Sequence, residues 1–152
     1  MAEALVVGEF HFAYAVGGRV EALRTWRVTT VDPNVAAKVA RLLGGMPRPV
    51  PLAAGGGLEV VTEADSVRVV MASRSGTHLG FCLEGSTGIG RFEFSPAPWT
   101  LDQMTRTCGH DGATGAGGRD AGARLIIKRV EIRTLTGMYV VHRLPVLVLP
   151  AV

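Results

Sequence analysis

Residues 58–71, LEVVTEADSVRVVM, decide the fold of this chain. They hold two aliphatic runs, 58–61 and 67–71, on either side of an acidic turn, TEADS, at 62–66. Runs of Val, Leu and Met between turn residues are typical of strands buried on both faces, because such strands need no polar alternation. The turn is too short for a helical crossover. We therefore expect two strands at the centre of the sheet, joined tightly or forming one bent ribbon, with the acidic side chains of the bend in solvent.

The segment before this stretch has the pattern of a β-hairpin. Apolar residues occupy the even positions of residues 4–16, and the alternation resumes after a glycine-rich turn. Period-two alternation predicts half-buried strands. A three-residue turn would pair Val16 with Val20 and Phe10 with Trp26, which keeps the aromatic side chains on one face.

Asp32 and Pro33 predict the start of a helix. The Asp32 side chain can cap the first-turn amides, and proline is favoured at the first helical position because its missing N–H costs nothing there. Gly44-Gly45 is typical of a helix end. We expect a helix over about residues 33–43 that packs on the sheet, because so short a helix is not stable alone. Its apolar stripe consists of Val35, Val39, Leu42 and Leu43.

The rest of the chain alternates short strands with turn-rich connections. Three prolines and three glycines predict an irregular connection over residues 47–57. The other expected elements are strands at 78–83 and 91–94, a helical turn at 100–104, a flexible glycine-rich loop at 107–122, and a hairpin of 124–134 with 138–144. The chain is therefore predicted to be α+β, a single domain over 1–152 with a mostly antiparallel sheet and one main helix.

Composition excludes several classes of protein. The chain of 152 residues is the size of one domain, and no apolar run approaches the roughly 18 residues that cross a bilayer. The first ten residues contain an acid and no basic stretch, so we expect no secretory signal and a cytoplasmic protein. Two cysteines favour a reducing compartment over a disulfide framework. The net charge of +3 allows an acidic partner without requiring one.

Zinc ligands are one candidate site. Cys82, Cys108 and His110 are the candidate ligands, with His78 and Asp111 nearby in sequence. Thiolate and imidazole suit zinc, but the paired C-x-x-C spacing that marks strong sites is missing. A buried free Cys82 and an ordinary loop Cys108 are the more common outcome. We expect no cofactor, with zinc as the alternative.

The sequence contains no recognisable catalytic motif. The G-x-S-x-G signature of a nucleophile is missing, and the glycine-rich segments 85–90 and 115–118 lack the Lys of a phosphate-binding loop. Glu63 and Asp65 are read as a solvated turn, since nothing near them in sequence would shift their pKa. We expect no catalytic residues.

The densest basic segment is the C-terminal hairpin. Arg suits contact with phosphate and with acidic partners. A solvated sheet face or a guarded edge strand is at least as common an explanation. The candidate residues for contact with a partner or with nucleic acid are Arg124, Lys128, Arg129, Arg133 and Arg143.

Several segments together resemble a known family. These are LRTWRVTT at 23–30, Asp32-Pro33, LLGG at 42–45 and LEVVTEAD at 58–65 followed by a Val-rich strand. Their order and spacing resemble the recombination directionality factors of actinobacterial phages and their chromosomal relatives. The match covers about residues 8–71. The segments CGHDG at 108–112, ARL at 123–125 and LTGMYV at 135–140 are similar to later parts of the same family.

The resemblance implies a non-catalytic accessory protein. Such a factor binds a large serine integrase and shifts its site-specific DNA recombination toward excision. It would meet DNA through this partner, would need no membrane, and is compatible with a homo-oligomer. We expect the hairpin from Arg124 to Arg143 and the loop after Cys108 to form the contact surface. The alternatives are a phage virion protein that packs through LPVLVLPAV at 144–152, and a small metal-binding protein or metal-dependent hydrolase.

Overall fold

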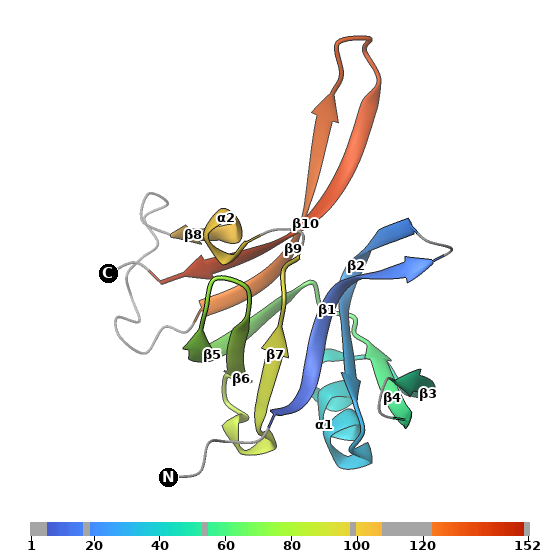
Figure 1. The fold of residues 1–152 in the computed structure, drawn as a ribbon, viewed down its shortest axis with the longest axis vertical. Helices are drawn as coiled ribbons and strands as arrows, with labels where there is room; N and C mark the ends of the chain where they lie inside the picture. Colours follow the sequence, from blue (N-terminus) through green and yellow to red (C-terminus); the bar gives the residue numbers. More distant parts are fainter. Residues whose placement is uncertain (1–5, 17–18, 53–54, 98–99, 108–122, 151–152) are drawn as a thin grey trace.

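A computed structural model describes residues 6–16, 19–52, 55–97, 100–107 and 123–150. Ten strands form one sheet, in the order β3-β4-β2-β1-β7-β6-β5-β9-β10-β8 (Figure 1). In chain order the elements are β1 (Val6–Val16), β2 (Arg19–Thr30), α1 (Pro33–Leu43), β3 (Pro47–Leu52), β4 (Gly55–Val61), β5 (Ser66–Arg74), β6 (Leu79–Leu83), the short 3-10 helix η1 (Thr87–Ile89), β7 (Arg91–Phe94), α2 (Leu101–Met104), β8 (Thr105–Thr107), β9 (Ala123–Arg133) and β10 (Tyr139–Leu149). Most neighbouring strands are antiparallel, so the sheet dominates a broadly α+β domain, as predicted.

The stretch 58–71 forms one bent ribbon that closes the sheet on itself. β4 pairs with β2, while β5 pairs with β6, and the order β2-β1-β7-β6-β5 connects the two. Because β5 follows β4 directly in the chain, the six strands β4-β2-β1-β7-β6-β5 form a ring, with β3 beside β4 and with β9, β10 and β8 following β5 in the sheet. The bend continues the ladder: the amide of Thr62 donates to the carbonyl of Trp26 at 2.8 Å, and the amide of Trp26 donates to the carbonyl of Ala64 at 3.3 Å. Of the two expected arrangements, the bent ribbon is the one observed, and β4 and β5 do not pair with each other. The expected central position is wrong for β4, which lies next to the edge strand β3.

Burial along this ribbon also differs from the expectation. β5 alternates, with Val67 and Val69 buried and Arg68 and Val70 exposed. One face of β5 points to the interior and the other outward, so alternate side chains are buried. The prediction of burial on both faces is therefore wrong for β5, whereas in β4 the adjacent residues Glu59 and Val60 are both buried.

An aromatic cluster fills the ring. Phe10 contacts the rings of Phe81 and Phe92 at centroid distances of 5.1 and 5.3 Å, and Trp26 contacts Phe94 at 5.2 Å. All five side chains are at most 2% exposed, and they come from β1, β2, β6 and β7. Trp26 Nε1 donates to the carbonyl of Asp65 at 3.1 Å, so its buried N–H is satisfied by the bend itself.

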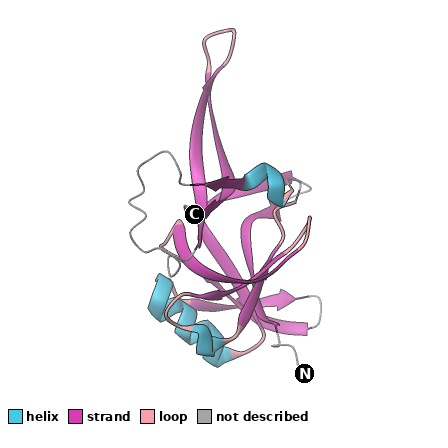
Figure 2. Ribbon diagram, turned by 90° about the vertical axis from the view of Figure 1, so that its left-hand side faces the viewer, coloured by secondary structure: helices cyan, strands magenta, loops and turns pink. Residues whose placement is uncertain are grey.

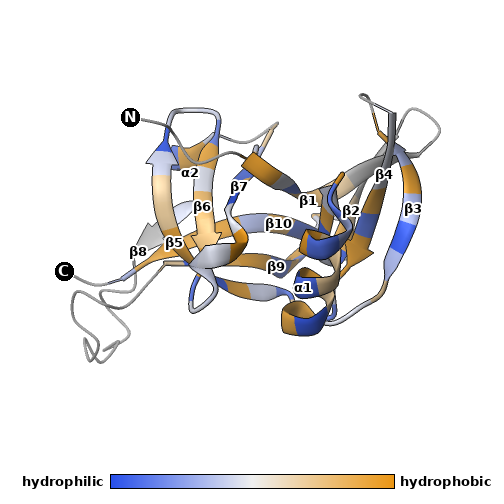
Figure 3. Cartoon of the chain, turned by 90° about the horizontal axis from the view of Figure 1, so that it is seen from below, coloured by the Kyte–Doolittle hydropathy of each residue, from blue (hydrophilic) through white to orange (hydrophobic). Residues whose placement is uncertain are grey.

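Helix α1 begins and ends where the sequence predicts. Asp32 Oδ1 accepts the amide of Asn34 at 2.8 Å, and Gly44 follows the last turn with a φ of 85°. The helix contacts β2, β3 and β4 (Figure 3). Its buried residues are Val35, Ala36 and Val39. Leu42, expected in the apolar stripe, is 49% exposed.

The β1–β2 hairpin has a shorter turn than expected. Val16 pairs with Arg19 and Phe10 pairs with Val28, so the predicted register is wrong. An irregularity in the ladder adds residues to β2 and brings even positions of the two strands back to the same face. Phe10 and Trp26 therefore still pack, with ring centroids 5.9 Å apart. The alternation identified the buried face but did not determine the register.

The proline-rich segment forms a strand instead of an irregular connection. β3 pairs with β4 along its whole length, with Arg48 opposite Glu59 and Val50 opposite Gly57. β3 lies at one end of the strand order, and proline is tolerated on an edge strand because one set of amides faces away from the ladder. The prediction of an irregular connection over 47–57 is therefore wrong, because the prolines lie on an edge strand, where they are tolerated.

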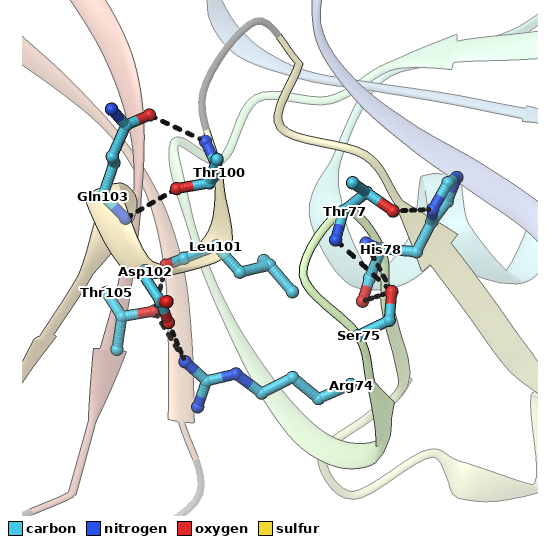
Figure 4. Close-up of polar contacts among 9 residues, drawn as sticks. All are labelled: Arg74, Ser75, Thr77, His78, Thr100, Leu101, Asp102, Gln103 and Thr105. Atoms are coloured by element: carbon cyan, nitrogen blue, oxygen red, sulfur yellow. Dashed lines mark hydrogen bonds and ion pairs between the residues drawn. The ribbon is translucent and has the colours of Figure 1, made fainter.

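The short helix α2 anchors the chain at the other end of the sheet. Thr100 and Gln103 form a capping box, with the Gln103 amide donating to Thr100 Oγ1 at 3.2 Å and the Thr100 amide donating to Gln103 Oε1 at 2.9 Å (Figure 4). Arg74 at the end of β5 lies 3.6 Å from Asp102 and donates to Thr105 Oγ1 at 3.3 Å (Figure 4). The Arg74 contacts link the end of β5 to α2 and to the first residue of β8, which pairs with β10. Of the predicted loop 107–122, residues 108–122 lie outside the described residues.

Candidate functional site

The β9–β10 hairpin extends beyond the body of the domain as an arm. β5 pairs with β9 only over residues 66–69 and 123–126, and β8 pairs with β10 only over 105–107 and 147–149. Residues 128–133 and 139–144 pair only with each other, in a ladder without irregularities. We call residues 128–144 the arm. Figures 1 and 2 show it projecting away from the other strands.

The tip of the arm is a closed turn with apolar side chains in solvent. The amide of Thr134 donates to the carbonyl of Met138 at 2.8 Å, and the amide of Gly137 donates to the carbonyl of Thr134 at 2.9 Å. Gly137 has a φ of 86°, a conformation that favours glycine. Leu135 is fully exposed and Met138 is 65% exposed. The turn therefore presents two large apolar side chains on a hydrogen-bonded frame.

The arm has two faces of different chemistry. Residues directly opposite each other in an antiparallel ladder lie on the same face, and successive residues alternate. The charged face contains the pairs Arg129/Arg143, Glu131/Val141 and Arg133/Tyr139. The apolar face contains the pairs Lys128/Leu144, Val130/His142 and Ile132/Val140.

Positive charge is concentrated in this part of the chain. Residues 124–149 contain five cations and one acid, a net charge of +4, whereas the whole chain carries +3, so the remainder carries −1. Arg129 forms an ion pair with Glu131 at 2.7 Å, and Arg133 lies over the ring of Tyr139 at 5.7 Å from its centroid. Exposed pairs of this kind contribute little to stability. The cations are therefore available to an acidic partner.

The predicted contact residues do not form one surface. Arg129, Arg133 and Arg143 share the charged face of the arm. Lys128 lies on the apolar face at the base of the arm, and Arg124 lies below it, beside Arg68 of β5. The structure thus brings three of the five residues together and separates the other two.

The proposed zinc ligands are only partly described. Cys82 is a free, half-buried cysteine on β6. Cys108 and His110 lie outside the described residues, as does Asp111. His78 hydrogen-bonds through Nδ1 to Thr77 Oγ1 at 2.9 Å (Figure 4). Within the described ranges, no group of three or more His, Cys, Asp or Glu side chains is arranged to hold a metal ion.

Sequence reasoning missed a polar cluster on the outer side of β1, β2 and β4. Glu59 is 8% exposed and pairs with Arg27, and its other oxygen lies 3.4 Å from Arg48. His11 Nε2 lies 2.9 Å from Thr29 Oγ1. Burial, with a smaller contribution from the positive charge of Arg27, lowers the pKa of His11 to about 4, so the imidazole is neutral at pH 7. A charged residue inside the aliphatic run 58–61 was the available signal.

A small pocket lies beside this cluster. It has a volume of ≈ 110 Å³ and is lined by Glu9, Phe10, His11, His78, Glu93, Phe94 and Ser95. Pockets that bind metabolites or drug-sized ligands are typically about 300–1,000 Å³. The pocket is therefore below the usual size for an organic substrate.

No match to this chain is found among protein-family models, curated proteins or solved structures. No described helix has the length and apolar character needed to span a membrane.

Proposed function

We propose that this protein is a non-catalytic factor that acts by binding another protein through the β9–β10 arm. One observation carries the proposal: the arm extends beyond the neighbouring strands and presents exposed apolar and cationic side chains. Ile132, Leu135 and Met138 are 47%, 108% and 65% exposed. Grouped apolar side chains in solvent are typical of sites that bind a partner.

We propose a large serine integrase as that partner, on the resemblance of residues 8–71 to recombination directionality factors. A protein that binds one conformation of an integrase more tightly than another shifts the population toward the first. A difference of a few kcal/mol is sufficient to reverse which pair of attachment sites recombines. A compact body with a projecting arm can supply this differential binding without chemistry of its own.

The position of residues 144–149 bears on the alternative of a virion protein. That alternative used the apolar tail for packing between subunits. The tail instead forms the end of β10, where Val146 and Leu147 are buried against the domain. Because these side chains are buried within the domain, they cannot pack against a second subunit, and we do not favour a virion protein.

A recombination assay tests the proposal. Purified protein is added to the serine integrase encoded in the same genome, with either the integration pair or the excision pair of attachment sites. We expect excision to rise and integration to fall. A variant in which Asn-Gly replaces residues 129–143 keeps the body of the domain and removes most of the arm, and it should have no effect. If the intact protein changes neither reaction and does not bind the integrase, the proposal is wrong.

A further inference from the structure

The polarity of β9 inverts where the strand leaves the body of the domain. Within the body, the odd positions face the core and are at most 5% exposed; they are Ala123, Leu125 and Ile127. On the arm the odd positions of β9 are charged and the even positions are aliphatic; they are Arg129, Glu131 and Arg133 against Val130 and Ile132. The apolar face of the arm therefore lies on the opposite side of the ribbon from the core of the domain.

Because of this inversion, the aliphatic face of the arm is not a continuation of the buried face of the body. A ribbon that only extended the core would keep its aliphatic residues on the odd positions, where the body could cover them. Here the aliphatic residues Val130, Ile132 and Val140 are on the side that the domain core does not cover. Ile132 is 47% exposed, while Val130 and Val140 are half-buried. Complete burial of this face would require a second molecule.

We propose that the apolar face of the arm binds an apolar surface of a protein partner, and that acidic side chains rim this surface. The inference rests on the proposed function and specifies the partner's chemistry. The argument is charge complementarity: residues 124–149 carry a net +4 and the rest of the chain −1. Aliphatic contacts supply the affinity. Lys128 lies on the same face, and the arginines on the opposite face of this two-stranded ribbon add a positive potential that favours an acidic rim.

Two other molecules could bind the arm, a second copy of this chain or DNA, and the charges of the arm and their placement disfavour both. A second copy of this chain would bring another arm of net positive charge against the first, so two arms repel each other. DNA would meet the charged face, where Arg129, Arg133 and Arg143 lie, and would leave the apolar face in water. An acidic protein surface is attracted by the net positive charge of the arm and also covers its apolar face.

Two matched substitutions test the inference. Ile132 lies on the apolar face and Val141 on the charged face, and they are 47% and 40% exposed. Ile132→Thr and Val141→Thr both keep a β-branched residue, so the strand is preserved. Binding of the full chain to the integrase is measured by titration calorimetry. We expect Ile132→Thr to weaken binding about tenfold and Val141→Thr by less than about twofold.

The outcomes separate this inference from the proposed function. Equal effects of the two substitutions would overturn the inference while the integrase remained the partner. Failure of the unaltered chain to bind the integrase would overturn both. A 30-base-pair duplex that binds through Arg129 and Arg143, without loss in Ile132→Thr, would identify DNA as the occupant instead. A dimer in sedimentation that Ile132→Thr dissociates would identify a second copy.

Discussion

At the scale of single residues, His11 is the titratable group of the described chain whose pKa is shifted clearly by its surroundings. It faces Thr29 at hydrogen-bond distance, and Glu9 lies 3.8 Å from its Nε2. Burial is the main cause of its lowered pKa, Arg27 adds to the shift, and Glu59 opposes it. The imidazole is therefore held neutral by its surroundings although two carboxylates are close.

This predicts an acid-sensitive stability. The pKa of His11 falls from the usual 6.5 to about 4 on folding, so the unfolded chain takes up the proton more readily. Stability is present above about pH 6.5 and is lost as the pH falls toward 4, by about 2 kcal/mol between pH 7 and pH 5. Urea unfolding at several pH values measures it. His11→Gln keeps a hydrogen bond to Thr29 and should flatten the dependence, and an unchanged slope would contradict the assignment.

At the scale of elements, β3 shows how proline protects the edge of a sheet. Pro47, Pro49 and Pro51 occupy alternate positions, and proline has no amide to donate. The ladder with β4 must therefore use the amides of the other positions, including Val50. The prolines remove donors from the free edge, where another chain could otherwise add a strand.

Two substitutions in β3 should have opposite consequences. Pro49→Val restores a donor on the free edge, so we expect stability to change little and self-association on heating to increase. Val50→Pro removes a donor from the ladder and should lower the free energy of unfolding by about 2 kcal/mol. Light scattering and urea unfolding measure the two effects. If both variants lost the same stability, the assignment of the free edge would be wrong.

At the scale of the whole molecule, the ring of strands and the arm are stabilised by different contacts. The ring is held by its aromatic cluster and by the bend at 62–65, which accepts hydrogen bonds from Trp26 on one side and from Ile127 of β9 on the other. The arm begins directly after Ile127. Beyond this point β9 pairs with no strand of the body, so we expect the stability of the ring to depend little on the arm.

Removal of the arm therefore separates function from folding. With Asn-Gly in place of residues 129–143, we expect the melting temperature to stay within a few degrees of that of the intact chain. Trp26→Ala is the contrasting variant, because it empties the ring and should cost about 3–5 kcal/mol. Calorimetry compares the two. A truncated chain as unstable as Trp26→Ala would show that the arm belongs to the core.

Local chemistry made several features predictable. Asp32-Pro33 and Gly44-Gly45 set the ends of α1, because a cap and a helix terminator act through their immediate neighbours. The alternation of apolar and polar residues identified most strands and the face that carries the buried aromatic side chains, because alternation too is a local property of the chain. The two strands of the arm and the three cations of its charged face could also be predicted from the sequence.

The remaining features depend on contacts between residues far apart in the chain. Whether residues 47–52 form a strand depends on an edge that β4 provides, and the register of β1 with β2 depends on an irregularity that repacks Phe10 and Trp26. The separation of Arg124 from the three arginines of the arm depends on where β5 stops pairing with β9. For residues 58–71 the local pattern was enough to predict two strands with a solvated acidic bend. That this bend closes a ring, with Trp26 and Ile127 bonded to its two sides, follows from long-range hydrogen bonds that no local pattern encodes.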